Sequence, residues 1–213
     1  MDLFWKNSAT MLAHPTSLFA LLGILLLIGL FLRLRHIKVT TPMLIYIGLM
    51  LASAILLHQF KLYHMPQGGS ITCGSMIPLL LIAYRYGPGV GCLTGFLYGL
   101  INMMQNPFIL HPVQVLFDYP LPYMVLGLAA LFPQHRFLST GLAFFSRFLC
   151  HFISGAVFFG SYAPEGTSPY LYSLVFNASY LVPEFFICFL LLKFLPITRL
   201  LRAMDHSSAR YEG

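Results

Sequence analysis

Long apolar runs, separated by short polar or proline- and glycine-containing segments, dominate the hydropathy pattern of this chain. The runs predict seven helical spans, which lie at about 17–34, 42–60, 71–85, 88–104, 111–133, 138–160 and 169–196. At 1.5 Å per residue, such helices cross most or all of a hydrocarbon layer roughly 30 Å thick. The pattern therefore predicts an all-α integral membrane protein, with a bundle of six helices and one extra N-terminal transmembrane helix.

Prolines and glycines predict where these helices bend or end. Pro78 is expected to kink the helix over 71–85, and Gly87-Pro88-Gly89 to form a turn before the next helix. Pro120 and Pro122 fall within the span over 111–133. Between 160 and 169, the segment SYAPEGTSP is rich in turn formers and joins the last two spans.

Two series of small residues at a spacing of four indicate faces for close helix packing. Gly91, Gly95 and Gly99 would form one smooth face, which we expect to pack inside the bundle. Gly48 and Ala52 form a similar pair on the helix over 42–60. That pair would serve either packing within the bundle or docking of a partner membrane protein, and the sequence favours neither.

The composition supports a membrane protein and excludes a soluble domain. The chain is 58% hydrophobic and 8% charged, with a mean hydropathy of +0.80, whereas soluble domains have about 25% charged residues. The net charge of +6 is not gathered on a polar surface, so nucleic-acid binding is not expected. The four cysteines form no CxxC pair, and we predict no disulfide, metal site or cofactor.

The distribution of basic residues predicts the orientation in the membrane. Arg33, Arg35 and Lys38 follow the first apolar run, and the positive-inside rule therefore places the N-terminus outside and the C-terminus in the cytoplasm. We divide the chain into an extra helix with a basic cytoplasmic end (1–38), a six-helix membrane domain (39–198) and a polar cytoplasmic tail (199–213).

Polar side chains embedded in the later apolar runs predict a pocket. Asp118, His151, Tyr172 and Asn177 fall at similar depths near the outer face, where polar groups in lipid are kept for a function more often than by chance. One carboxylate, an imidazole, an amide and neighbouring aromatic rings suit a small, flat ligand that is cationic or forms hydrogen bonds.

Each of these groups also has a purely structural interpretation. A single histidine or asparagine within a membrane is often an interhelical hydrogen bond. Arg147 lies one turn from His151 and can extend toward the membrane surface, while Glu184 either pairs with Arg147 or is protonated. The sequence alone leaves these alternatives open.

Three stretches of the chain carry a resemblance to a known family. They are HMPQGGSITCGSMIPLLLIAYRYG, HPVQVLFDYP and HFISGAVFFGSYAPEGTSPYLYSLVFNASY. Over residues 42–197 the chain resembles the thiamin-specific substrate-binding (S) subunits of energy-coupling factor (ECF) transporters. The resemblance implies a six-helix S-component bundle in a prokaryotic cell membrane, to which the helix over 17–34 is an addition.

The resemblance implies a set of thiamin-binding residues near the outer face. The matching positions are Phe108, Asp118, Tyr119, His151, Phe159, Tyr172 and Asn177. Asp118 and Asn177 would bond the aminopyrimidine ring, and Phe159 would stack on it. His151 and Tyr172 would lie beside the thiazolium. A lid loop over 61–70 would close the pocket, with Met65, Gln67, Gly68 and Gly69.

The chain departs from that family at three of these positions. Asp118 stands where the family has Glu, and Phe159 where it has Trp. A lid tryptophan is expected near Gly69, yet the only tryptophan of the chain is Trp5.

The resemblance also implies a transport mechanism without covalent chemistry. The S subunit captures thiamin outside and reorients while docked on a transmembrane coupling protein (EcfT-type), and two cytoplasmic ATPases drive the cycle. The chain has no GxxxxGK[ST] phosphate-binding loop, so the ATPases would be separate chains. Gly48 and Ala52 are the candidate contact with the coupling protein.

Two other functions are compatible with the residues. One is an S component for a thiamin precursor, the hydroxymethylpyrimidine or the thiazole. The other is an intramembrane hydrolase, in which Ser154, His151 and Asp118 would form a catalytic triad, although the chain lacks a GxSxG motif.

Overall fold

The structure is a computed structural model that describes residues 15–34, 37–38 and 40–209. Its elements are α2 (Pro15–Leu34), α3 (Thr41–Gln59), β1 (Lys61–His64), β2 (Ser70–Thr72), α4 (Ile77–Gln105), α5 (Pro112–Asp118), α6 (Pro120–Met124), the 3-10 helices η1 (Val125–Ala130) and η2 (Pro133–His135), α7 (Arg136–Phe158), η3 (Gly160–Tyr162), α8 (Pro169–Phe194) and α9 (Ile197–Ala209). Predictions about Trp5, Arg35 and the last four residues lie outside the described ranges.

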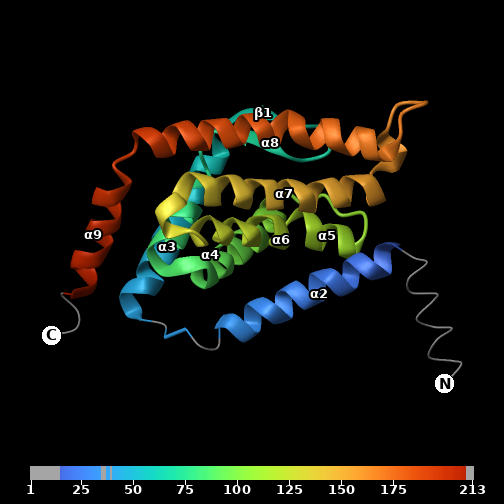
Figure 1. Cartoon of the computed structure of the whole chain (residues 1–213). Coiled ribbons are helices and arrows are strands. Elements are labelled where there is room, and N and C mark those ends of the chain that lie inside the picture. The colour runs from blue at the N-terminus through green and yellow to red at the C-terminus, as the bar shows by residue number, and fades with distance from the viewer. Residues whose placement is uncertain (1–14, 35–36, 39, 210–213) are drawn as a thin grey trace, which may run out of the picture.

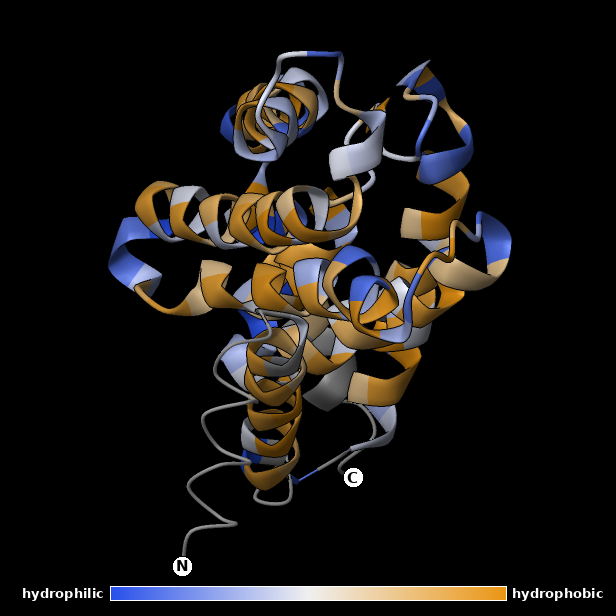
Figure 2. Ribbon diagram, turned by 90° about the vertical axis from the view of Figure 1, so that its right-hand side faces the viewer, coloured by the Kyte–Doolittle hydropathy of each residue, from blue (hydrophilic) through white to orange (hydrophobic). Residues whose placement is uncertain are grey.

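Most of the helices stack in layers, and α3 and α9 run across one end of them (Figure 1). In Figure 1, α8 lies above α7, α7 lies above α4, α5 and α6, and α2 crosses the opposite side of the bundle. Apolar residues predominate along the helices, and polar ones gather at turns and helix ends (Figure 2). Within the part of the chain that the structure describes, four segments are long and apolar enough to cross a membrane: Thr41–Gln59, Pro112–Ala130, Pro133–Phe158 and Pro169–Phe194. The all-helical membrane class is confirmed, and the count of seven spans stays a prediction.

The predicted lid loop is a β-hairpin, which corrects two expectations. β1 pairs antiparallel with β2, with Lys61 opposite Thr72 and His64 opposite Ser70. Since β2 occupies residues 70–72, the helix predicted from residue 71 begins only at Ile77. Pro78 does not kink it, because it stands in the first turn, where a backbone N–H has no partner within the helix.

The kink lies instead at Gly87, beside Pro88. Gly87 has φ 85° and ψ 176° within the otherwise helical span of α4, a backbone conformation that only glycine adopts readily. The predicted turn at 87–89 is therefore a sharp bend between two helical halves.

The glycine face of α4 packs as predicted, directly against the backbone of α6 and η1. A Cβ atom on Gly95 would lie 2.0 Å from the carbonyl oxygen of Tyr123, and one on Gly99 would lie 2.4 Å from that of Tyr119. These contacts fix α6 close to α4, which sets the floor of the site described below.

The span over 111–133 is not one continuous helix. α5 ends at Asp118, Tyr119 departs from helical geometry with φ −118° and ψ −78°, and α6 and η1 follow. Pro120 has no N–H to continue the α-helical ladder across this point. As a result, Asp118 sits at an irregular position whose side chain is aimed by its neighbours.

The C-terminal segment, which was predicted as a polar tail, is helical as far as Ala209. After a break at Leu195, where ψ is 139°, α9 runs from Ile197 to Ala209. Met204 is buried in a cluster with Met43 and Ile47 of α3, because α9 has one apolar face that covers the ends of α3 and α4. In Figure 1, α9 turns away from the direction of α8 and crosses the end of the bundle.

Candidate functional site

A pocket lies between the α4–α6 layer, the α7–α8 layer and the β-hairpin. Its empty space, including the mouth, is about 900 Å³. All but one of the predicted binding and lid residues line it: Gln67, Gly68, Gly69, Phe108, Asp118, Tyr119, His151, Phe159, Tyr172 and Asn177. The exception is Met65, whose sulfur lies 3.9 Å from the hydroxyl of Ser179 on α8. The fold therefore brings residues from five segments of the chain into one cavity.

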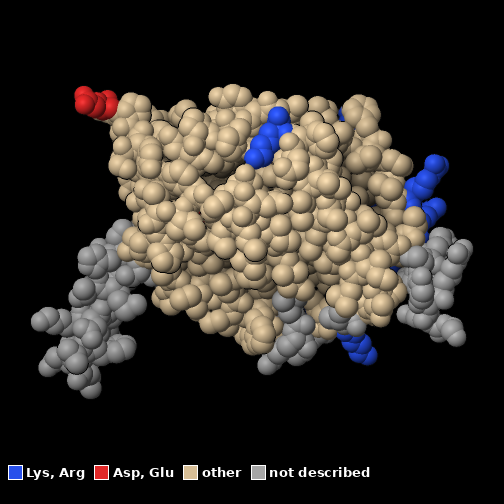
Figure 3. All heavy atoms as spheres, turned by 180° about the vertical axis from the view of Figure 1, so that it is seen from behind, with Lys and Arg blue, Asp and Glu red and all other residues tan. Residues whose placement is uncertain are grey.

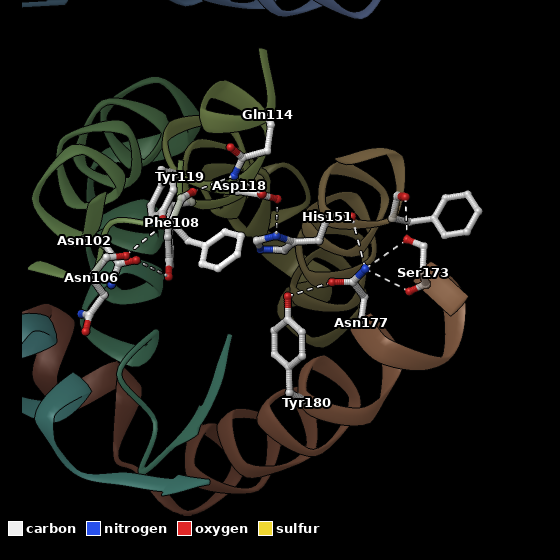
Figure 4. Close-up of polar contacts among 12 residues, drawn as sticks. Asn102, Asn106, Phe108, Gln114, Asp118, Tyr119, His151, Ser173, Asn177 and Tyr180 are labelled. Carbon is white, nitrogen blue, oxygen red and sulfur yellow. Dashed lines mark hydrogen bonds and ion pairs between the residues drawn. The ribbon is translucent and has the colours of Figure 1, made fainter. Parts of the chain in front are cut away.

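Asp118 is held by one neighbour on each carboxylate oxygen. The side-chain amide of Gln114 donates to Oδ2 at 2.6 Å, and Nδ1 of His151 lies 3.4 Å from Oδ1. Both partners are buried. Figure 4 shows the carboxylate between them, facing the pocket. Each oxygen has a remaining lone pair, so the carboxylate is oriented and still able to accept a ligand hydrogen.

The loop that carries Phe108 is fixed by two side chains of the broken helix. The Tyr119 hydroxyl donates to the carbonyl of Asn106 at 2.9 Å and accepts the N–H of Phe108 at 2.7 Å. The amide of Gln114 donates to the carbonyl of Phe108 at 3.0 Å. Tyr119 therefore acts mainly by positioning Phe108. Sequence analysis did not include Gln114 in the site.

His151 and Asn177 present free acceptor capacity to the pocket. Nε2 of His151 is buried and has no hydrogen-bond partner among the described residues. The amide nitrogen of Asn177 is committed to the carbonyls of Ser173 (2.9 Å) and His151 (3.2 Å). Among the described residues its Oδ1 accepts the Tyr180 hydroxyl alone, at 3.0 Å, which leaves one lone pair for a ligand donor. Figure 4 shows these groups on α7 and α8.

Aromatic rings gather at one side of the pocket. Phe108 stacks on Phe159 with ring centroids 5.7 Å apart and an interplanar angle of 24°. Tyr162 lies 5.8 Å from Phe159 and 6.4 Å from Phe108. Phe159 is buried although it follows the end of α7. Its ring gives the site a flat apolar face next to Asp118 and His151.

Glu184 fastens the hairpin to α8 and does not bond to Arg147. Its Oε2 accepts the backbone N–H of Thr72 at 2.5 Å, and its Oε1 accepts the Thr72 hydroxyl at 2.7 Å. Thr72 is the last residue of β2. Of the two alternatives that sequence analysis left open for Glu184, the structure does not show the pairing with Arg147, because the carboxylate bonds to Thr72 instead.

We expect Glu184→Ala to lower the unfolding temperature by about 5–10 °C. The buried backbone N–H of Thr72 would lose its acceptor, at about 1–3 kcal/mol, whereas the Thr72 hydroxyl still has Ser75 Oγ at 2.8 Å. A chain of this size loses roughly 2–4 °C per kcal/mol. Differential scanning fluorimetry in detergent measures the shift, with the exposed loop residue Glu165→Ala as the control of equal charge. Equal melting temperatures for the two variants would contradict the contact.

Arg147 is buried beneath the pocket without a carboxylate partner among the described residues. Its guanidinium lies 4.6 Å from the centroid of the Tyr123 ring, and its Nε and Nη1 atoms make no hydrogen bond. Close to it, the Tyr123 hydroxyl donates to Asn102 at 3.3 Å, and Asn102 lies 3.2 Å from Nε2 of His58. Sequence analysis did not identify His58 and Asn102 as pocket residues. Each is a polar residue within an apolar run, which was the signal that could have indicated them.

The residues proposed for a hydrolytic triad do not assemble. Asp118 and His151 are in contact, but the hydroxyl of Ser154 is fully buried and has no hydrogen-bond partner among the described residues. A nucleophilic serine needs a hydrogen bond to its base. The geometry therefore suits binding better than acyl transfer.

Comparisons with known proteins agree on one family. Residues 44–203 match the family described as "Thiamine transporter protein". The curated relative "Thiamine transporter ThiT" of Bacillus subtilis is 40% identical, over 75% of this chain and 94% of the relative. A protein of the same name from Lacticaseibacillus paracasei is 30% identical, over 48% of this chain and 61% of the relative. The solved structure of ThiT from Listeria monocytogenes superposes with a TM-score of 0.62, at 22% identity, over 76% of this chain and 93% of that one; at this identity it supports the fold alone.

Proposed function

This chain belongs to the thiamine transporter protein family, and on that premise we propose that it is the thiamin-binding S component of an ECF-type transporter. The observation that supports this most directly is the convergence of Asp118, His151, Asn177 and Phe159 on one cavity. Family membership assigns transport rather than catalysis, which leaves the hydrolase alternative without support.

The pocket offers complementary groups for both rings of thiamin. The aminopyrimidine has an exocyclic amine. Its N–H groups can donate hydrogen bonds to the free lone pairs on the Asp118 carboxylate and on Oδ1 of Asn177. Phe159, which lines the pocket and packs one face on Phe108, would stack on the aminopyrimidine with its other face. The thiazolium carries a fixed positive charge, which favours the aromatic ring of Tyr172 and the unpartnered Nε2 of His151 nearby.

The β-hairpin is the proposed lid. Gln67, Gly68 and Gly69 line the pocket. The hairpin is tied to α8 through Thr72 and Glu184, and Lys61 Nζ lies 3.4 Å from Oδ1 of Asn106. We expect the turn between the strands to close over bound thiamin while these contacts hold the base of the hairpin in place.

Delivery of thiamin would require separate partners. We place the transmembrane coupling protein on the face of α3 that carries Gly48 and Ala52, with two cytoplasmic ATPases behind it. Both residues are exposed, and a Cβ on Gly48 would meet no atom within 4 Å. This exposure argues against packing inside the bundle, and it fits close approach by another helix in the membrane.

Thiamin at 100 times its dissociation constant is expected to stabilise the purified protein by about 2.7 kcal/mol. At roughly 2–4 °C per kcal/mol, this raises the melting temperature by about 5–10 °C. Thermal shift in detergent measures the effect. Hydroxymethylpyrimidine and the thiazole, each added alone, distinguish thiamin from its precursors. A melting temperature that thiamin leaves unchanged at millimolar concentration would overturn the proposal.

A further inference from the structure

A second pocket lies at the other end of α7 and α8 from the thiamin pocket. Its lining residues come from the start of α7, the end of α8 and the start of α9, with one residue of α4: Tyr84, Arg136, Phe137, Leu192, Leu195, Pro196, Ile197, Thr198, Arg199 and Arg202. Its empty space is about 1020 Å³ including the mouth. Arg136 precedes Arg147 of the first pocket by eleven residues, or about 16 Å of helix, so the two sites are separate.

One of its three arginines is held in place before any ligand arrives. The Arg136 guanidinium lies 5.8 Å from the centroid of the Tyr84 ring. The Tyr84 hydroxyl is 2.5 Å from Oγ1 of Thr140, and the Thr140 hydroxyl donates to the backbone carbonyl of Arg136 at 2.8 Å. These contacts fix the pocket wall and leave the guanidinium nitrogens available.

The positive charge of this pocket is not balanced by a carboxylate in its lining. Asp118 and Glu184 line the first pocket, and Glu165 lies in the loop between α7 and α8. Asp205 follows on α9, and its side chain is outside the description. On the face shown in Figure 3, the acidic atoms in view lie at one upper corner, while basic side chains lie at the opposite edge, at the lower side and near the middle of the upper surface. Three guanidiniums around a cavity are therefore suited to an anion.

The remaining walls are apolar and continue onto the lipid-facing surface. Leu192, Leu195 and Ile197 line the pocket. Beside them, Phe137 is 47% exposed and Phe194 is 80% exposed. Free phosphate would make no favourable contact with apolar walls. A phospholipid would place its phosphate at the arginines and its acyl chains along the rings of Phe137 and Phe194.

We propose that this pocket binds the phosphate-bearing headgroup of an anionic phospholipid. Arg136, Arg199 and Arg202 contact the phosphate, and α9, which crosses the end of the bundle (Figure 1), lies at the membrane surface. A zwitterionic lipid is a poorer ligand, because its own cation would be repelled by three arginines. The site is independent of thiamin binding.

Titration of the purified full-length protein with phosphatidylglycerol or phosphatidylcholine tests this. Native mass spectrometry measures the bound lipid. We expect wild-type protein to retain phosphatidylglycerol preferentially. Replacement of all three arginines by glutamine should weaken that binding about 100-fold, at about fivefold for each basic residue. Arg199→Gln alone, on an exposed side chain of α9, should weaken it about fivefold with the fold intact.

The matched control replaces Arg33, Lys38 and Lys193 by glutamine, which removes the same charge from exposed positions that do not line the pocket. Its affinity for phosphatidylglycerol should stay within threefold of wild type. An equal loss in the control and the pocket variant would overturn the proposal, since the effect would be general surface charge. Equal retention of the two lipids by wild type would also overturn it, as would full competition by inorganic phosphate at millimolar concentration.

Discussion

Asp118→Ala is expected to reduce the affinity for thiamin by about 100-fold. The carboxylate is half-enclosed, oriented by Gln114 at 2.6 Å and by His151 at 3.4 Å, and aimed into the pocket. A hydrogen bond to a charged group contributes about 1.5–3 kcal/mol, and 1.4 kcal/mol corresponds to a factor of ten in the dissociation constant. Isothermal titration calorimetry of the purified variant with thiamin measures the loss.

Two further variants separate the carboxylate from general effects of charge and fold. Glu165→Ala removes an equal charge from an exposed loop and should bind thiamin as wild type does. Asp118→Glu restores the carboxylate one methylene further out and should recover most of the affinity. If Asp118→Ala bound thiamin within threefold of wild type, the proposed role of this residue would be wrong.

Gly95→Ala is expected to lower the melting temperature by about 10 °C or to prevent accumulation of folded protein. The added Cβ would lie 2.0 Å from the carbonyl oxygen of Tyr123 and 2.6 Å from its carbonyl carbon. Neither atom belongs to a side chain that can rotate away. Overpacking in a core costs about 1–3 kcal/mol, and more when the backbone must move. Fluorescence-detected size-exclusion chromatography during heating measures the change.

Gly141→Ala is the matched control for that variant. Gly141 is also helical, on α7, and a Cβ there would meet no atom within 4 Å. The substitution should be neutral or slightly stabilising, because alanine favours a helix over glycine by about 1 kcal/mol. Equal melting temperatures for the two variants would show that α4 and α6 are not packed backbone to backbone.

Much of the helical framework could be predicted, because a segment that crosses lipid must consist mainly of apolar residues. Apolar stretches with few charges, bounded by polar turns, predicted α2, α3, α7 and α8 to within a few residues. The glycine face of α4 was also predicted, since only small residues allow such close contact. The hairpin, the break at Tyr119 and the helix α9 were not predicted, because each depends on contacts with a distant part of the chain. Glu184 holds β2, and the backbone of α4 packs against α6 after the break. Met43 and Ile47 pack against α9.

The candidate site was predicted by residue type and depth, and its supporting contacts were not. Asp118, His151 and Asn177 were identifiable as polar groups in apolar runs, and all three line the pocket. Gln114, Tyr180 and Thr72 were not, because amides, hydroxyls and tyrosines are common in such runs. These residues matter through specific hydrogen bonds, and such bonds cannot be inferred from the spacing of residues in the sequence.

The sequence by itself determined that this protein is embedded in a bilayer, which polar groups fall within its apolar segments, and which family it resembles. Only the tertiary structure decided that Glu184 holds the hairpin, that Tyr119 holds Phe108, and that three distant arginines surround a second cavity. The physical reason is that burial in lipid depends on the composition of each segment, whereas directional contacts depend on how separate segments are placed against one another.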